Sequence, residues 1–182
     1  MKWLDRLFGG PKDMGALPAG TQAPDFSLPA VAGDKHGGKF SLQSALKKGP
    51  VLVAFFKVSC PTCQYTLPYL ERLHKTHGDK EITIVGISQD SPRDTAAFLK
   101  EYGVTFCTLV DDPNGYAVSN AYGLTNVPSL FLIGQGGKIE ISSVGWVKQD
   151  VEDVNRKLAA AQQTAPPAIF QPGEDVRDFR AG

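Results

Sequence analysis

Cysteine is scarce in this chain, with three residues among 182. Three cysteines are too few for a disulfide framework, and an odd number leaves at least one outside any intramolecular pair. An excess of charge of either sign is also missing, because 19 basic and 19 acidic residues give a formal net charge of zero. No basic block predicts nucleic-acid binding, and no acidic tract predicts a disordered tail.

Long apolar runs are absent as well. No segment approaches the ~20 apolar residues that a membrane-spanning helix needs. The first ten residues lack the apolar core and the small-residue cleavage site of a secretory signal. From these two absences we predict a cytoplasmic location and no membrane span.

The residues that are present suffice for a folded domain. The chain is 42% hydrophobic and 21% charged, so it can bury a core without disulfide staples. We expect one domain over residues 23–163, preceded by a lead-in over 1–22. A proline-containing segment without periodic pattern, residues 164–182, predicts an extended or disordered C-terminal tail.

Two of the three cysteines lie three residues apart in Cys60-Pro61-Thr62-Cys63. The apolar run 51–56 precedes this pair and an amphipathic stretch follows it, which predicts a strand, a short loop and a helix that begins at the pair. Helix N-termini favour negative charge, and the thiolate is the nucleophilic form of cysteine. Pro61 suits the first helical position, and Thr62 is expected to bond locally to the backbone. The placement predicts disulfide exchange.

Strand and helix patterns alternate through the middle of the chain. Apolar runs predict strands at 51–56, 82–87, 106–110 and 129–133, and amphipathic stretches predict helices at 61–77, 91–103 and 150–162. Short hairpins are expected near residues 25–42 and 129–144. This order predicts an α/β sandwich with helices on both faces of the sheet.

A zinc site is the first alternative, because Cys60, Cys63, His74 and His77 superficially resemble a ligand set. Cys63 and His74 lie eleven residues apart on one predicted helix. That separation is roughly 16 Å at 1.5 Å per residue, which one tetrahedral zinc ion does not span. We therefore predict no metal site, and we expect both histidines to face solvent on the last helical turn.

The chain resembles the TlpA/ResA-type thiol-disulfide oxidoreductases of the thioredoxin-like superfamily, which carry a redoxin or AhpC-TSA-like domain. The resemblance runs from about residue 23 to residue 158. It implies a thioredoxin-like three-layer α/β/α sandwich with a central mixed sheet and an N-terminal β-hairpin extension. The matching motifs are the opening segment 23–28, Pro68 in the active-site helix, the inserted strand and helix at 85–88 and 98–104, and Val127-Pro128 before the strand 129–133.

The resemblance also implies roles for single residues. Cys60 would attack a disulfide of a protein partner, and Cys63 would resolve the mixed disulfide. Val127 and Pro128, joined by a cis bond, would shape the substrate groove, and no metal or organic cofactor would be required. The third cysteine, Cys107, is expected to be a buried, inert thiol, with a second redox role as the alternative.

The direction of electron flow is not encoded in the motif. The predicted cytoplasmic location favours a reductase. An envelope-facing location stays open, because the family has many such members. The physiological partner and the upstream electron donor are not encoded in the motif either.

Two departures from the family pattern concern proton transfer. Plain thioredoxins carry a buried aspartate six residues before the first cysteine, where this chain has Ala54. TlpA/ResA-type proteins often have a glutamate three residues after the second cysteine, where this chain has Thr66. The proton acceptor for Cys63 is therefore missing from both expected positions. Lys57 is the nearest charged residue in the sequence, and we hypothesise that it favours the Cys60 thiolate.

A thiol peroxidase of the peroxiredoxin type is the closest rival function. Peroxiredoxins place a proline and a Thr or Ser seven and three residues before the peroxidatic cysteine. Relative to Cys60 these positions hold Val53 and Lys57, and relative to Cys63 they hold Phe56 and Cys60. Neither register fits a peroxidase. A non-catalytic binding module of the same fold stays open, because both relay carboxylates are absent.

Overall fold

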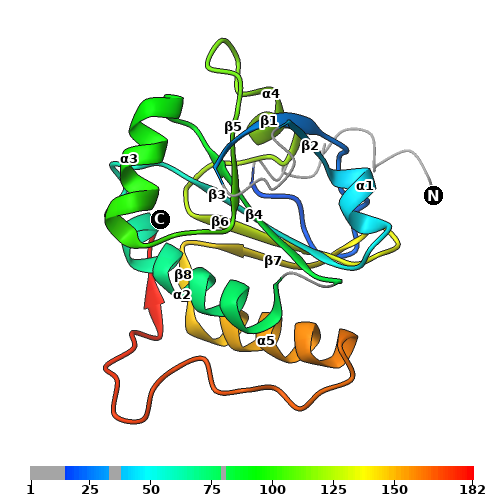
Figure 1. Ribbon diagram of the computed structural model, residues 1–182, viewed down its shortest axis with the longest axis vertical. Coiled ribbons are helices and arrows are strands. Elements are labelled where there is room, and N and C mark those ends of the chain that lie inside the picture. Colours follow the sequence, from blue (N-terminus) through cyan, green and yellow to red (C-terminus); the bar gives the residue numbers. More distant parts are fainter. Residues whose placement is uncertain (1–14, 33–37, 79–80) are drawn as a thin grey trace, which may run out of the picture.

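The computed structural model describes residues 15–32, 38–78 and 81–182. Within these ranges the chain forms a seven-stranded sheet, a separate two-stranded ribbon and five helices (Figure 1). The strands are β1 (Ser27–Ala32), β2 (Lys39–Ser41), β3 (Val51–Phe56), β4 (Thr83–Ser88), β5 (Cys107–Val110), β6 (Ser129–Ile133), β7 (Ile139–Val144), β8 (Trp146–Val147) and β9 (Phe179–Arg180). The helices are α1 (Leu42–Leu46), α2 (Pro61–His77), α3 (Pro92–Tyr102), α4 (Ala117–Ala121) and α5 (Lys148–Ala161).

The large sheet is mixed and has the strand order β2-β1-β5-β4-β3-β6-β7. Strands β3, β4 and β5 pair in parallel, whereas the other pairs are antiparallel. All six residues of β3 are buried, because this strand lies between two neighbours and both of its faces are covered. The predicted sandwich with a central mixed sheet is confirmed.

Each face of the sheet carries its own hydrophobic core. Helices α2, α3 and α5 contribute to the core on one face, and α1 and α4 contribute to the core on the other. Alternate side chains of β3 enter the two cores, as the period of a strand requires. Cys63 is buried in the first core, whereas Cys107 packs against the second, so the sheet separates these two cysteines.

The predicted N-terminal hairpin is confirmed, because β1 pairs antiparallel with β2. Its turn, residues 33–37, lies outside the described residues, as do residues 1–14 of the predicted lead-in. The described part of the lead-in is bonded to the domain, since the Gly20 N–H donates to the Ile139 carbonyl at 2.7 Å.

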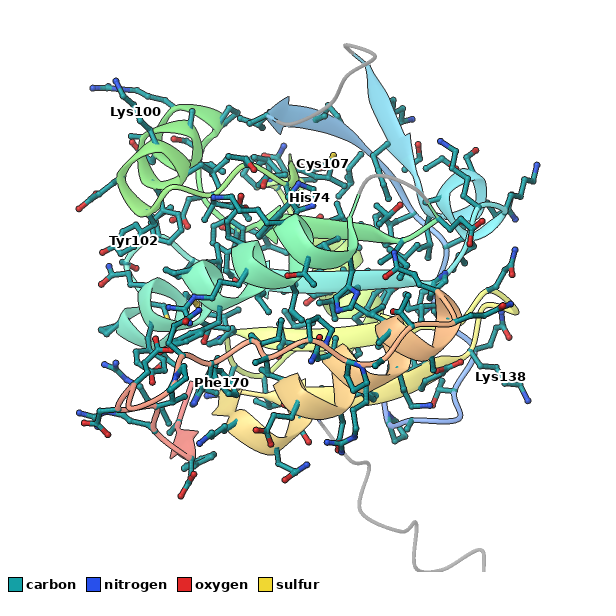
Figure 2. The ribbon with its side chains drawn as sticks, turned by 60° about the horizontal axis from the view of Figure 1, so that its bottom comes forward. His74, Lys100, Tyr102, Cys107, Lys138 and Phe170 are labelled. Atoms are coloured by element: carbon teal, nitrogen blue, oxygen red, sulfur yellow. The ribbon has the colours of Figure 1, made fainter. Side chains whose placement is uncertain are left out.

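The C-terminal tail, residues 164–182, is extended. After α5 it runs back along the molecule, and its end lies beside the beginning of α2 (Figure 1). Phe170 of the tail, which is labelled in Figure 2, packs edge to face against Tyr69 of α2 and Trp146 of β8. The Arg72 guanidinium of α2 donates two hydrogen bonds of 2.8 Å to the Glu174 carboxylate. The tail is therefore held by contacts along its length.

The tail ends as the strand β9. This strand pairs antiparallel with β8, so that Trp146 lies opposite Arg180 and Val147 lies opposite Phe179. The tail also explains why α5 begins at Lys148 rather than at the predicted residue 150. The Lys148 N–H donates to the Asp178 carbonyl at 2.9 Å, and this bond occupies a donor that a helix N-terminus leaves open.

None of the helices in the described ranges combines the length and the apolar character that crossing a bilayer requires.

Candidate active site

The cysteine pair lies at the N-terminus of α2, as predicted. Pro61 is the first helical residue, and Cys60 is the N-cap with an extended backbone (φ −83°, ψ 115°). The Cys60 Sγ accepts a hydrogen bond from the Cys63 N–H at 3.3 Å. The sulfur of Cys60 therefore takes the position that a serine or aspartate oxygen takes in an ordinary N-cap, where the helix dipole favours negative charge.

The two cysteines differ in their environments. Cys60 is partly exposed, whereas Cys63 has no exposed surface. Burial raises the pKa of the Cys63 thiol well above its ordinary value, and its hydrogen bond with Cys60 raises it further. A smaller opposing effect comes from a hydrogen bond with the Lys57 backbone, which lowers the pKa. One sulfur is thus partly exposed, and the other is buried one turn inside the helix, where its protonated form is favoured.

The loop that faces the cysteines leads into β6, which pairs with β3 on the side away from β4. The Val127–Pro128 peptide bond is cis, which confirms the expectation for this loop. The Cys60 thiol donates to the Val127 carbonyl at 3.3 Å. Strand β6 holds the loop in place, since the Ser129 hydroxyl donates to the Asn126 carbonyl at 2.7 Å. Cys60 and Val127 are far apart in the sequence, and the antiparallel pairing of β3 with β6 brings them together in space.

A cavity of about 400 Å³ opens beside Cys60. It is lined by Lys57, Cys60, Gln89, Leu124, Thr125, Asn126, Val127 and Gly182. Lys57 is exposed and lies on the loop that leads into the helix, where its carbonyl accepts the Cys60 N–H at 3.3 Å. The structure thus places Lys57 and Val127 at one opening with Cys60.

Neither of the two expected relay positions carries an acid. Ala54 is fully buried in the same core as Cys63. Thr66 is also fully buried, and its hydroxyl donates to the Thr62 carbonyl at 2.7 Å. The two departures noted in the sequence therefore face the interior around Cys63.

A carboxylate whose charge reaches Cys63 is Asp90, which the sequence analysis did not single out. It follows the end of β4, the parallel neighbour of β3, and its Oδ2 accepts the Val58 N–H at 2.7 Å. The charge of Asp90 contributes to the raised pKa of Cys63. The sequence did contain one signal for Asp90, because this acid comes just after the carboxyl end of a strand that lies next to β3.

The tail also reaches the cysteine motif, which no sequence pattern indicated. The Thr62 hydroxyl donates to the Ala181 carbonyl at 2.6 Å. The Asn126 side-chain amide donates to the Gly182 carbonyl at 3.3 Å. Thr62 was expected to bond to the local backbone, and its hydroxyl instead bonds to a residue at the far end of the chain.

The expectation for the two histidines of α2 is wrong. His77 is 1% exposed, and its ring nitrogens lie 2.8 Å from the Gln162 Oε1 and 2.7 Å from the Asn155 Oδ1. His74 is half-buried with its ring edge-on to Phe106, and its Nδ1 is buried (Figure 2). The helix end is covered by α5 and the chain that follows it, so the histidines serve packing. Within the described residues, no cluster of three or more His, Cys, Asp or Glu could hold a metal ion.

Cys107 differs from its expectation in one respect. It is partly exposed rather than buried. It packs on the face of the sheet opposite Cys63. This placement separates Cys107 from the cysteine pair.

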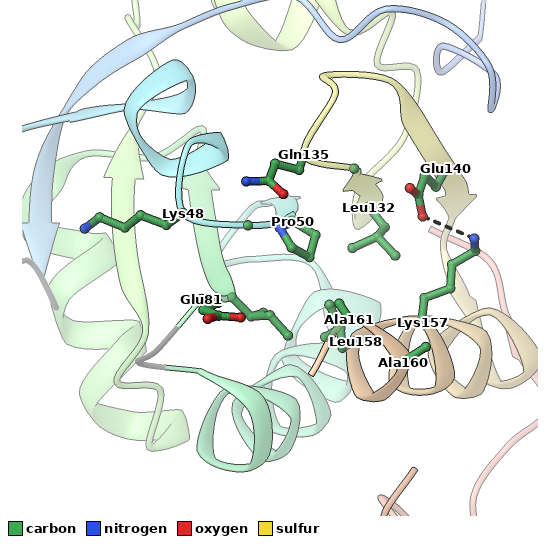
Figure 3. Close-up of a pocket in the computed structure, with 13 residues that line it drawn as sticks. Lys48, Pro50, Glu81, Leu132, Gln135, Glu140, Lys157, Leu158, Ala160 and Ala161 are labelled. Carbon is green, nitrogen blue, oxygen red and sulfur yellow. Dashed lines mark hydrogen bonds and ion pairs between the residues drawn. The ribbon is translucent and has the colours of Figure 1, made fainter. Parts of the chain in front are cut away.

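A second cavity, of about 410 Å³, lies at the opposite end of the sheet (Figure 3). It opens where β3 and β4 begin and β6 ends, beside Pro50, Ile82 and Gly134. An ion pair of 3.1 Å between Lys157 and Glu140 borders it. The cavity shares no residue with the opening beside Cys60, so we assign it no part in the cysteine chemistry.

Comparison with known proteins identifies the family. The family model described as "AhpC/TSA family" matches residues 19–142, more than half of the chain. A thioredoxin-like protein YneN from Bacillus subtilis is 31% identical over 146 residues, which cover 78% of this chain and 80% of that protein. A thiol-disulfide oxidoreductase ResA from Halalkalibacterium halodurans is 29% identical over 143 residues, which cover 78% and 77%.

A solved structure agrees with these relatives. The thiol:disulfide interchange protein of the thioredoxin family from Chlorobium tepidum TLS superposes with a TM-score of 0.63 at 27% identity. The match covers 80% of this chain and 97% of that one. The chain therefore belongs to the AhpC/TSA family and is a thioredoxin-like oxidoreductase of the TlpA/ResA type.

Proposed function

We propose that this oxidoreductase exchanges dithiol for disulfide with protein partners through Cys60 and Cys63, and that it acts as a reductase. The observation that carries the proposal is the contrast between the two sulfurs. Cys60 is partly exposed at a helix N-terminus beside the cis-proline loop, and Cys63 is buried one turn along with its N–H bonded to the Cys60 sulfur. We further propose residues 23–163 as the catalytic domain, with 1–22 and 164–182 as appended segments.

The proposed reaction has two steps. In the first, the Cys60 thiolate attacks one sulfur of a partner disulfide, and the other partner sulfur leaves as a thiolate and takes up a proton. In the second, Cys63 loses its proton and attacks the Cys60 sulfur, and the remaining partner sulfur leaves and is protonated in turn. The partner disulfide is reduced to two thiols while Cys60 and Cys63 are oxidised to a disulfide. An external dithiol must then reduce this disulfide to complete the cycle.

Asp90 is the group we propose to receive the proton of Cys63. The raised pKa of Cys63 means that this thiol needs an acceptor before it can attack. The Asp90 carboxylate is oriented by the Val58 N–H at 2.7 Å. Its negative charge makes the smallest of the contributions that raise the pKa of Cys63, and an ionised carboxylate at this loop is a group that can accept the proton.

Three further residues complete the proposed site. We propose that Val127 and Pro128 form the wall against which a partner strand would lie, since the Val127 carbonyl accepts the Cys60 thiol and Val127 lines the opening. Lys57, exposed at the same opening, would favour the Cys60 thiolate through its positive charge. For Lys57, the test is the pH profile of Cys60 alkylation in Lys57→Met. We expect the reactive form to appear at higher pH, and an unchanged profile would remove this role.

The test of the function is reduction of insulin disulfides with dithiothreitol as electron donor. We expect turnover by the unaltered chain, and none above the dithiothreitol background with Cys60→Ser. Thiol peroxidase activity is the second candidate, favoured by the description of the matching family, and turnover of hydrogen peroxide without insulin reduction would support it instead. If the protein shows neither insulin reduction nor peroxide turnover, the result would indicate a non-catalytic binding module.

The direction of electron flow and the cellular location of the protein are predictions that depend on each other. A cytoplasmic location favours the reducing direction, whereas an envelope-facing location is compatible with either. Measurement of the reduction potential separates the two directions without knowledge of the partner.

A further inference from the structure

The end of the tail occupies the groove beside the cysteine pair. The Ala181 carbonyl accepts from the Thr62 hydroxyl at 2.6 Å, and the Gly182 carbonyl accepts from the Asn126 amide at 3.3 Å. Gly182 lines the same cavity as Cys60. Two side-chain donors from different parts of the site thus meet backbone oxygens of two consecutive residues of one extended segment.

The fit of the tail is close. Thr62 is only 4% exposed, although Pro61 beside it is exposed. A Cβ atom on Gly182 would lie 2.6 Å from the Val127 carbonyl oxygen, so a larger residue there would force the backbone away. The Val127 carbonyl is also the group that accepts the Cys60 thiol. The last residue of the sequence therefore lies against the carbonyl that faces the proposed nucleophile.

The tail approaches the site as a strand. β9 pairs antiparallel with β8, and this pairing aligns the tail toward the cis-proline loop. Arg177, two residues before β9, forms hydrogen bonds through both of its backbone groups. Its carbonyl accepts the Trp146 Nε1–H at 2.6 Å, and its N–H donates to the Tyr65 hydroxyl at 3.1 Å. These bonds involve backbone groups of the tail.

We propose that β8, Thr62 and the Asn126–Pro128 loop form a binding site for an extended polypeptide backbone, and that residues Phe179–Gly182 of this chain are its resting occupant. A disulfide-bearing segment of a partner protein reaches Cys60 by replacing the tail on this site. The partner class is an extended protein segment, since Thr62 donates to a peptide carbonyl and β8 pairs with a strand. The inference rests on the proposed function for the identity of the competing substrate.

The test uses the full chain with Gly182→Val, which pushes the tail end from Val127. Gly115→Val is the matched control, because a Cβ there meets nothing within 4 Å and the backbone is not in the left-handed region. Two rates are measured: alkylation of Cys60 by N-ethylmaleimide, located by peptide mass mapping, and insulin reduction. We expect Gly182→Val to raise the alkylation rate and to lower the KM for insulin about threefold or more with kcat unchanged, because apparent affinity scales with the free fraction of sites.

Hydrogen exchange at residues 179–182 shows whether the tail has left its place. Arg180→Pro is a second variant, because proline weakens strand pairing. Released tails with unchanged Cys60 alkylation and unchanged KM would overturn the inference, as would fast exchange of these amides in the unaltered chain. If no form reduces insulin, the proposed function fails, while the alkylation rates and amide exchange still decide whether the tail covers Cys60.

Discussion

The hydroxyl of Thr62 donates a hydrogen bond of 2.6 Å to the carbonyl of Ala181. This bond joins a residue between the two cysteines to a residue next to the end of the sequence. Access to the cysteine pair and the position of the tail are therefore parts of one arrangement.

Replacing Cys63 with serine should stop the reaction at the mixed disulfide. The Cys60 sulfur stays accessible, but serine has no thiol with which to release the bound partner. Incubation with oxidised substrate protein should give a covalent adduct at Cys60, visible by mass spectrometry and reversed by dithiothreitol. Cys107→Ser is the control and should release its partner as the unaltered chain does. Equal accumulation of adduct in both variants would argue against Cys63 as the resolving cysteine.

Replacing Asp90 with asparagine should slow the resolving step. Asparagine keeps an oxygen that can accept the Val58 N–H, so the loop should hold its shape, but it cannot take up the Cys63 proton. General base catalysis is typically worth about 10²–10⁴ in rate, and we expect a loss of roughly tenfold or more because water can replace part of it. Single-turnover decay of the mixed disulfide measures this step. A rate equal to that of the unaltered chain would assign the proton to another acceptor.

Acidification should loosen the tail. The Arg72 guanidinium lowers the pKa of the Glu174 carboxyl from its ordinary 4.5 to about 2, and the Gln171 N–H adds to this effect. Because the folded state disfavours the proton, this contribution to tail attachment is complete above pH 4.5 and is lost as the pH falls toward 2. The Gln171 amide signal in ¹H–¹⁵N spectra should follow that transition.

Two variants complete the acid experiment. Glu174→Gln should abolish the transition at Gln171, because its side chain does not titrate. Glu101→Gln, at an exposed position on α3, should leave it in place. A transition that persists in Glu174→Gln would show that another group controls the tail at low pH.

Periodic patterns accounted for most of the fold. The buried run of β3 and the helix after it placed the cysteine pair correctly, and the expectation of a cis bond at Val127-Pro128 is confirmed. These features depend on local sequence and on the order of elements. The start of α5 at Lys148 differs from the predicted start, and there a distant segment of the chain supplies a hydrogen bond.

The features that the sequence did not predict depend on long-range contacts. The tail sequence has no periodicity, and apart from the short pairing of β9 with β8 its backbone groups bond to single partners such as Thr62, Tyr65 and Trp146. His77 looked exposed at a helix end, but α5 and the following residue Gln162 cover it. Asp90 lies in a loop, and only the parallel pairing of β3 with β4 brings it to the cysteine site.

The most direct test of the account is the reduction potential of the Cys60–Cys63 pair, measured by equilibration with thiol–disulfide buffers and quantified by alkylation and mass spectrometry. We predict a reversible two-electron couple that is lost in Cys63→Ser, with a potential nearer the thioredoxin value of about −270 mV than the oxidant value of about −120 mV. A couple near −120 mV would contradict the reducing direction. Absence of any reversible Cys60–Cys63 disulfide would contradict the proposed exchange itself.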